Sequence, residues 1–123
     1  LGHEVYYVEA HARAPSMFIE HENEDGSQRA AAFIDSVMRR FDFGDRWAFR
    51  GRYPGGRCYG LSEADLRQLY RDADAFLNVT GAQEIRDEHL ECRRRIYVES
   101  DPFASQVKVA AGEAASLAVS VAF

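Results

Sequence analysis

The sequence predicts one α/β domain with a mostly parallel sheet. Helical and extended patterns alternate along the chain, as in βαβ units whose helices cover a parallel sheet. The extended segments are short apolar runs rich in β-formers, which is typical of strands buried on both faces. A length of 123 residues suits one hydrophobic core. We therefore expect residues 1–123 to form a single domain.

The first half of the chain contains two predicted strands and one helix. Residues 3–9 contain the apolar run Val5 to Val8 and form the first predicted strand. The long loop 10–26 that follows is a candidate binding rim. From Ser27 a helix is expected to end at Gly44, and residues 47–49 form a short strand before a glycine-rich loop, 51–60. The helix is expected to bury Phe33, Ile34, Val37, Met38 and Phe41, which recur every three or four residues.

The second half repeats the alternation. Ser62 is a predicted N-cap, with Asp65 in place of the usual capping-box glutamate, and Leu66, Leu69, Tyr70 and Ala73 form the buried stripe of the helix. A buried strand is expected at 75–79, a helix at 83–91, a strand at 95–98 and a helix at 103–111. Residues 116–123 alternate with period two, which suits an edge strand.

Composition and charge exclude several classes of function. The net charge is −5, and the basic residues are interleaved with acids, so we expect no nucleic-acid partner. No stretch is long and apolar enough to span a bilayer, and no signal peptide is recognised, so a cytoplasmic location is expected. The two cysteines and four histidines lack metal-ligand spacing. Neither a metal nor another cofactor is expected.

Candidate site residues follow the predicted strands, because ligands of open α/β sheets bind beyond the carboxyl ends of the strands. Thr80 and Gly81 follow the predicted strand 75–79, and the carboxylates Glu99 and Asp101 follow the predicted strand 95–98. Glu99 and Asp101 are candidate acid–base residues, although Asp before Pro is also a common turn or helix cap. The predicted ligand-binding residues are Asn78, Thr80, Gly81, Asp101 and Gln106.

Three segments carry a resemblance to a known family. They are GHEV at 2–5 with the strand that follows it, ADAFLNVTG at 73–81 and RRIYVESDP at 94–102. Together they resemble part of the N-terminal Rossmann-like domain of bacterial GT-B-type glycosyltransferase-like proteins. The resemblance covers residues 1–111 and leaves 112–123 as a divergent tail. It implies a three-layer Rossmann-like domain and, for the family, metal-independent transfer of a sugar from a nucleotide donor.

The chain also departs from that family, since it lacks the family's first strand and C-terminal domain. We therefore expect a fragment or stand-alone relative that binds a nucleotide sugar or acceptor, and whether it catalyses transfer stays open. One alternative is a non-catalytic interaction or oligomerisation module of the same fold, and another is a small hydrolase using Glu99 and Asp101. The sheet edge left by the missing strand is expected to be filled by 116–123 or by a second copy in a homodimer.

Overall fold

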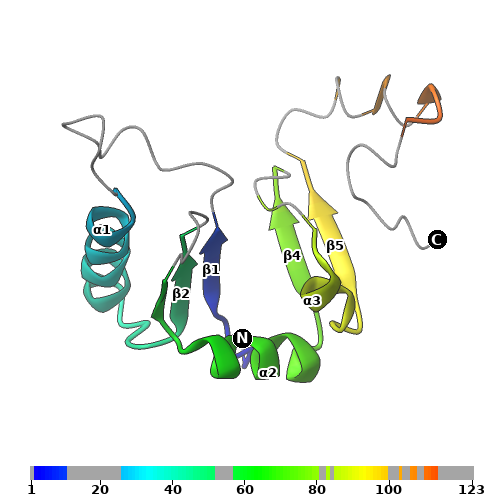
Figure 1. The fold of residues 1–123 in the computed structure, drawn as a ribbon. Coiled ribbons are helices and arrows are strands. Elements are labelled where there is room, and N and C mark those ends of the chain that lie inside the picture. The colour runs from blue at the N-terminus through cyan, green and yellow to red at the C-terminus, as the bar shows by residue number, and fades with distance from the viewer. Residues whose placement is uncertain are drawn as a thin grey trace. The chain divides into compact units, whose positions relative to one another are not determined.

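Strands and helices alternate along the chain, as the sequence predicts (Figure 1). The computed structural model describes residues 2–10, 26–51, 57–80, 83, 85–99, 103, 106–107 and 110–113. The elements are β1 (Tyr7–Ala10), α1 (Ser27–Arg40), β2 (Trp47–Arg50), β3 (Cys58–Gly60), α2 (Glu63–Asp72), β4 (Phe76–Val79), α3 (Asp87–Leu90) and β5 (Arg95–Val98). They fall into two compact units, residues 1–66 and 67–123, each of which is described by itself.

The first unit contains a mixed three-stranded sheet in the order β1-β2-β3. β1 runs parallel to β2, and β3 runs antiparallel to β2. The sequence prediction missed β3, which lies in the expected glycine-rich loop, because a three-residue strand ending in glycine resembles a turn. β1 also begins later than predicted and includes Ala10, whereas Val5 lies outside the strand and is exposed.

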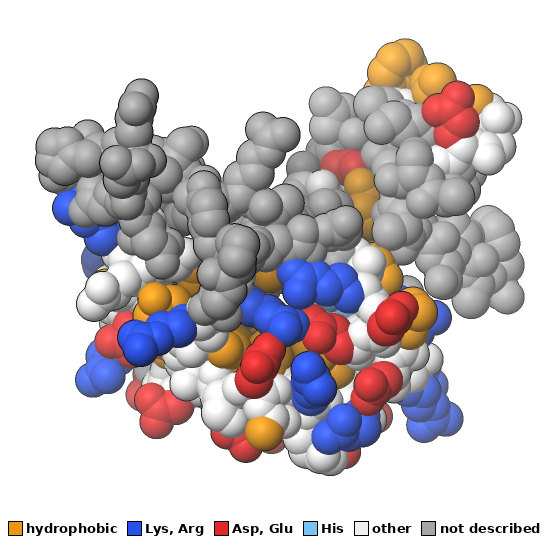
Figure 2. Space-filling view, viewed as in Figure 1, with side chains coloured by type: hydrophobic (Ala, Val, Ile, Leu, Met, Phe, Trp, Pro, Cys, Tyr) orange, Lys and Arg blue, Asp and Glu red, His pale blue; other side chains and the backbone are white. Residues whose placement is uncertain are grey.

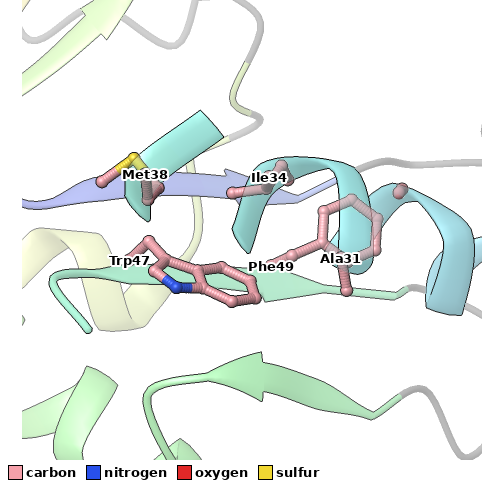
Figure 3. Packing of buried hydrophobic residues seen from close by; sticks show 6 residues of the cluster. Ala31, Ile34, Met38, Trp47 and Phe49 are labelled. Carbon is pink, nitrogen blue, oxygen red and sulfur yellow. The ribbon is translucent and has the colours of Figure 1, made fainter. Parts of the chain in front are cut away.

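The core of the first unit lies between α1 and β2. Figure 3 shows Ile34 and Met38 of the helix against Trp47 and Phe49 of the strand, with Ala31 beside them. Ala30 completes the buried set. Trp47 and Phe49 are two residues apart, so both side chains point to the face that the helix covers.

The predicted burial of two aromatic residues of α1 is wrong, because Phe33 and Phe41 are both exposed. Phe33 lies outside the stripe that Ala30, Ile34 and Met38 form at spacings of four. Phe41 caps a helix that ends at Arg40, short of Gly44, so helical spacing no longer sets the direction of its side chain.

Gly60 is required where β3 approaches β2. Its φ is +77°, a conformation that L side chains rarely adopt. A Cβ at this position would lie 2.3 Å from the carbonyl oxygen of Trp47 and 2.9 Å from its indole ring. The same carbonyl accepts a 2.9 Å hydrogen bond from the amide of Leu61, so it is held in place.

The start of α2 matches the predicted cap. The Ser62 hydroxyl accepts a hydrogen bond from the amide of Asp65 at 3.1 Å and donates to the Asp65 carboxylate at 2.6 Å. Leu66 is buried, as the predicted hydrophobic stripe of this helix requires.

The next helix is shorter than predicted. A helix was expected at 83–91, and α3 comprises only Asp87–Leu90.

In the second unit, β4 and β5 form a parallel pair, with Phe76 opposite Arg95 and Val79 opposite Val98. One face of the pair is covered by an aromatic cluster. The ring of His89 from α3 stacks on Phe76 at 5.0 Å between centroids, and Tyr70 from α2 meets the imidazole edge-on at 4.8 Å. His89 is 2% exposed and Tyr70 4%.

The opposite face of this pair is open. Leu77, Val79, Ile96 and Val98 alternate with the covered residues, and their side chains are 40% to 56% exposed. We call these four residues the apolar sheet face. The prediction that strand 75–79 is buried is therefore wrong for this side of β4. None of the helices in the described part of the chain is long and apolar enough to cross a membrane.

Candidate functional site

The predicted site residues that the structure describes on β4 and β5 lie at the carboxyl edge of the pair. The amide of Thr80 donates a 2.7 Å hydrogen bond to the carbonyl of Val98, which brings the residue after β4 beside Glu99, the residue after β5. Thr80 has a φ of 57°, which is rare for a β-branched residue. Such backbone conformations cluster at binding and active sites.

Asn78 fixes the turn that follows β4. Its side chain is buried, its Nδ2 donates to the carbonyl of Gln83 at 2.8 Å, and its Oδ1 accepts from the Gln83 amide at 3.1 Å. Both ends of the carboxamide are thus engaged by the backbone five residues later. This arrangement suits Asn78 to holding the backbone of Gln83 beside the end of β4.

Glu99 is oriented by a neighbour that the sequence analysis overlooked. The phenol of Tyr97 donates a short hydrogen bond to Oε2 of Glu99. Tyr97 lies opposite Asn78 in the register of the pair, so both side chains belong to the face that carries the aromatic cluster. The spacing of two between Tyr97 and Glu99 is the signal that could have identified this contact. A carboxylate restrained in this way is a directed hydrogen-bond acceptor.

The other predicted site residues are not brought to this edge by any described contact. Gln106 lies on an exposed helical turn. Gly81 and Asp101 lie outside the described residues, as do 116–123, the expected edge strand. The acid–base pair of Glu99 and Asp101 therefore stays a prediction.

The same three-residue motif begins β1 in the first unit. Tyr7, Val8 and Glu9 repeat the order of residues 97–99, and the Tyr7 phenol donates to Oε2 of Glu9 at 2.6 Å. Tyr7 is 45% exposed, and the partial burial of its ring raises its pKa above the ordinary value of 10, with the hydrogen bond to Glu9 adding to the shift. In both places a tyrosine thus donates a hydrogen bond to the glutamate two residues later, which is Glu9 within β1 and Glu99 directly after β5.

The surface in Figure 2 carries lysine or arginine side chains interleaved with acidic ones. Several of the charges are paired, for example Arg50 with Glu63 at 2.6 Å and Arg39 with Asp35 at 2.9 Å. Within the part of the chain that the structure describes, no group of three His, Cys, Asp or Glu side chains could hold a metal ion.

Comparison of the chain with protein-family models, with curated proteins and with solved structures gave no match. The resemblance to GT-B-type glycosyltransferase-like proteins therefore stays a prediction from the three sequence segments at 2–9, 73–81 and 94–102. Functional inference for this chain has to come from the chemistry of its own residues.

Proposed function

We propose that the chain is a glycosyltransferase-related domain of three-layer Rossmann-like type, which binds a nucleotide sugar or a sugar acceptor at the carboxyl edge of β4 and β5. The alternation of strands and helices and the two parallel strand pairs support this architecture. In open parallel sheets, this edge is where ligands bind.

The Tyr97-oriented carboxylate of Glu99, beside the turn that Asn78 fixes, is the observation that carries the proposal. An ionised carboxylate only accepts hydrogen bonds, so it suits the hydroxyl donors of a sugar or ribose ring. Thr80 is exposed, and its hydroxyl, which donates a 2.7 Å hydrogen bond to the carbonyl of Val79, adds a second polar group with acceptor capacity at the same edge. Binding of a polyhydroxylated ligand is thus the activity best suited to these groups.

Catalysis is not part of the proposal. In the family that the chain resembles, transfer takes place in a cleft between two Rossmann-like domains, and only segments of the N-terminal one are recognised here. If the chain contributes to transfer, the resemblance implies a metal-independent reaction to which this edge supplies binding contacts.

Calorimetric titration with a panel of nucleotide sugars and free sugars tests the proposal. We compare the unaltered chain with Glu99→Gln and with the matched control Glu9→Gln, which changes the glutamate of the same motif in β1. A hydrogen bond to a charged group contributes about 1.5–3 kcal/mol, so Glu99→Gln should weaken binding by roughly tenfold or more. Equal binding by all three proteins, or no binding to any ligand, would contradict the proposal.

A non-catalytic interaction module is the second candidate function, and the apolar sheet face favours it. Four adjacent aliphatic side chains on an open face are typical of a protein contact. Sedimentation equilibrium over a range of concentrations distinguishes the two candidates. Reversible self-association that is lost in Leu77→Asp would support the module, whereas a monomer at all concentrations would contradict self-association through this face.

A further inference from the structure

His89 can take up a proton only at an atom that the fold already uses as a hydrogen-bond acceptor. Nδ1 of its imidazole accepts a 3.0 Å hydrogen bond from the backbone amide of Arg86. Nε2 lies 3.2 Å from the Tyr70 hydroxyl. A neutral imidazole has one N–H and one acceptor nitrogen, so the proton is on Nε2. Protonation would therefore place a second N–H on Nδ1, directly opposite the Arg86 amide N–H.

Burial also opposes a positive charge on this ring. His89 is 2% exposed, so an imidazolium in the packed unit would lose its hydration. The ring stacks on Phe76 at 5.0 Å between centroids. An aromatic face attracts a cation, but this attraction is smaller than the cost of dehydrating the cation. The packed unit therefore favours the neutral imidazole.

The charges around the ring act in the same direction. The titratable and charged groups on the surrounding elements are Tyr70 and Arg71 on α2, Arg95 and Tyr97 on β5, Glu99 after β5, and Arg86, Asp87, Glu88, Glu91 and Cys92 in or beside α3. Arg71 pairs with Glu91 at 3.4 Å, and Arg86 pairs with Glu88 at 3.8 Å. The guanidinium of Arg95 donates to the carbonyls of Leu90 and Cys92, so its positive charge lies at the end of α3. This charge repels a second positive charge on His89.

The contacts of His89 also hold α3 in place. The helix comprises only Asp87–Leu90, and His89 is its buried residue. A helix of one turn is not stable without tertiary contacts. The imidazole caps its first turn through the Arg86 amide and packs it on Phe76 of β4. If the ring left this position, α3 would lose both contacts.

We propose that His89 is a pH switch, which takes up a proton in mild acid and releases α3 from α2 and β4. A histidine in an unfolded segment titrates near pH 6.5, and the released form binds the proton that the packed form excludes. The packing of α3 is therefore at full strength above about pH 6.5 and weakens as the pH falls below it. The ratio of released to packed form should rise about 25-fold between pH 7 and pH 5. The proposal does not depend on ligand binding at the carboxyl edge.

Hydrogen exchange at the Arg86 amide tests the switch, because this proton is bonded to Nδ1. Exchange rates from pH 7 to pH 5 are corrected for the intrinsic effect of pH and converted to the equilibrium constant for opening. The unaltered chain is compared with His89→Phe, which keeps a stacked ring, and with the matched control His3→Phe at an exposed position. We expect the opening constant to rise about 25-fold in the unaltered chain and in His3→Phe, and to stay nearly constant in His89→Phe.

Nitrogen NMR of the imidazoles in the unaltered chain gives a second measurement that needs no variant. Imidazolium signals of His89 should appear only together with loss of protection at the Arg86 amide. An imidazolium signal from His89 while that amide stays protected would overturn the proposal, because the packed ring would then accept the proton. An opening constant that does not change with pH, or an equal rise in His89→Phe, would overturn it as well.

Discussion

Replacement of His89 should destabilise the second unit far more than replacement of an exposed histidine. The imidazole Nδ1 accepts a 3.0 Å hydrogen bond from the backbone amide of Arg86. Nε2 therefore carries the proton and lies 3.2 Å from the Tyr70 hydroxyl, to which it donates. The same ring stacks on Phe76. One side chain thus connects α2, β4 and the start of α3.

The expected size of the effect follows from these contacts. Each hydrogen bond contributes about 1 kcal/mol, and truncation of a buried aromatic ring to alanine costs about 3–5 kcal/mol. We expect His89→Ala to lower the free energy of unfolding by at least about 3 kcal/mol. His89→Phe keeps a stacked ring and loses the hydrogen bonds, so it should cost about 2 kcal/mol. His3→Ala, at an exposed position, should stay within about 0.5 kcal/mol of the unaltered chain.

Hydrogen exchange of the β4 and β5 amides in increasing urea measures this loss within the second unit. The two His89 variants should expose these amides at lower urea, with alanine the more severe. A His89→Ala effect as small as that of His3→Ala would refute the account, because a buried ring with two hydrogen bonds cannot be removed at so little cost.

Three other predictions concern single residues. Gly60→Ala should cost at least about 2 kcal/mol, measured by urea unfolding, whereas the control Gly44→Ala, also at positive φ but with nothing within 4 Å, should cost about 1 kcal/mol. Asn78→Ala should cost about 2 kcal/mol and speed hydrogen exchange at the amide of Gln83, and unchanged exchange would contradict its role in the turn. The pKa of Tyr7 is raised in the folded state, so folding favours the protonated phenol. This stabilisation is fully present below pH 10 and is lost as the pH rises through the raised pKa. Subtracting the absorbance titration of Tyr7→Phe from that of the unaltered chain gives the titration of Tyr7 alone. Its midpoint should lie above the pKa of an ordinary tyrosine.

The sequence predicted the alternation of elements well because strong local signals mark them. The Ser62 cap and the buried Leu66 define the start of α2, and the apolar runs define β4 and β5. The faces of the strands were harder to predict. A run of apolar residues does not reveal whether a second layer covers it, so Leu77 and Val79 were expected inside and are exposed.

Part of the candidate site was predictable from strand ends alone. Thr80 and Glu99 follow neighbouring parallel strands, and the structure places them side by side. The link between Asn78 and Gln83 was not predictable, because it depends on the path of a turn. The role of His89 was also not predictable, since its partners Tyr70 and Phe76 lie on other elements.

Amide chemical-shift mapping with the nucleotide sugar that binds most tightly tests the central claim most directly. If the carboxyl edge of β4 and β5 is the binding site, the largest shifts should fall on Thr80, Gln83 and Glu99, and Glu99→Gln should diminish them. Shifts confined to other parts of the chain, or none with any nucleotide sugar or free sugar, would contradict the claim.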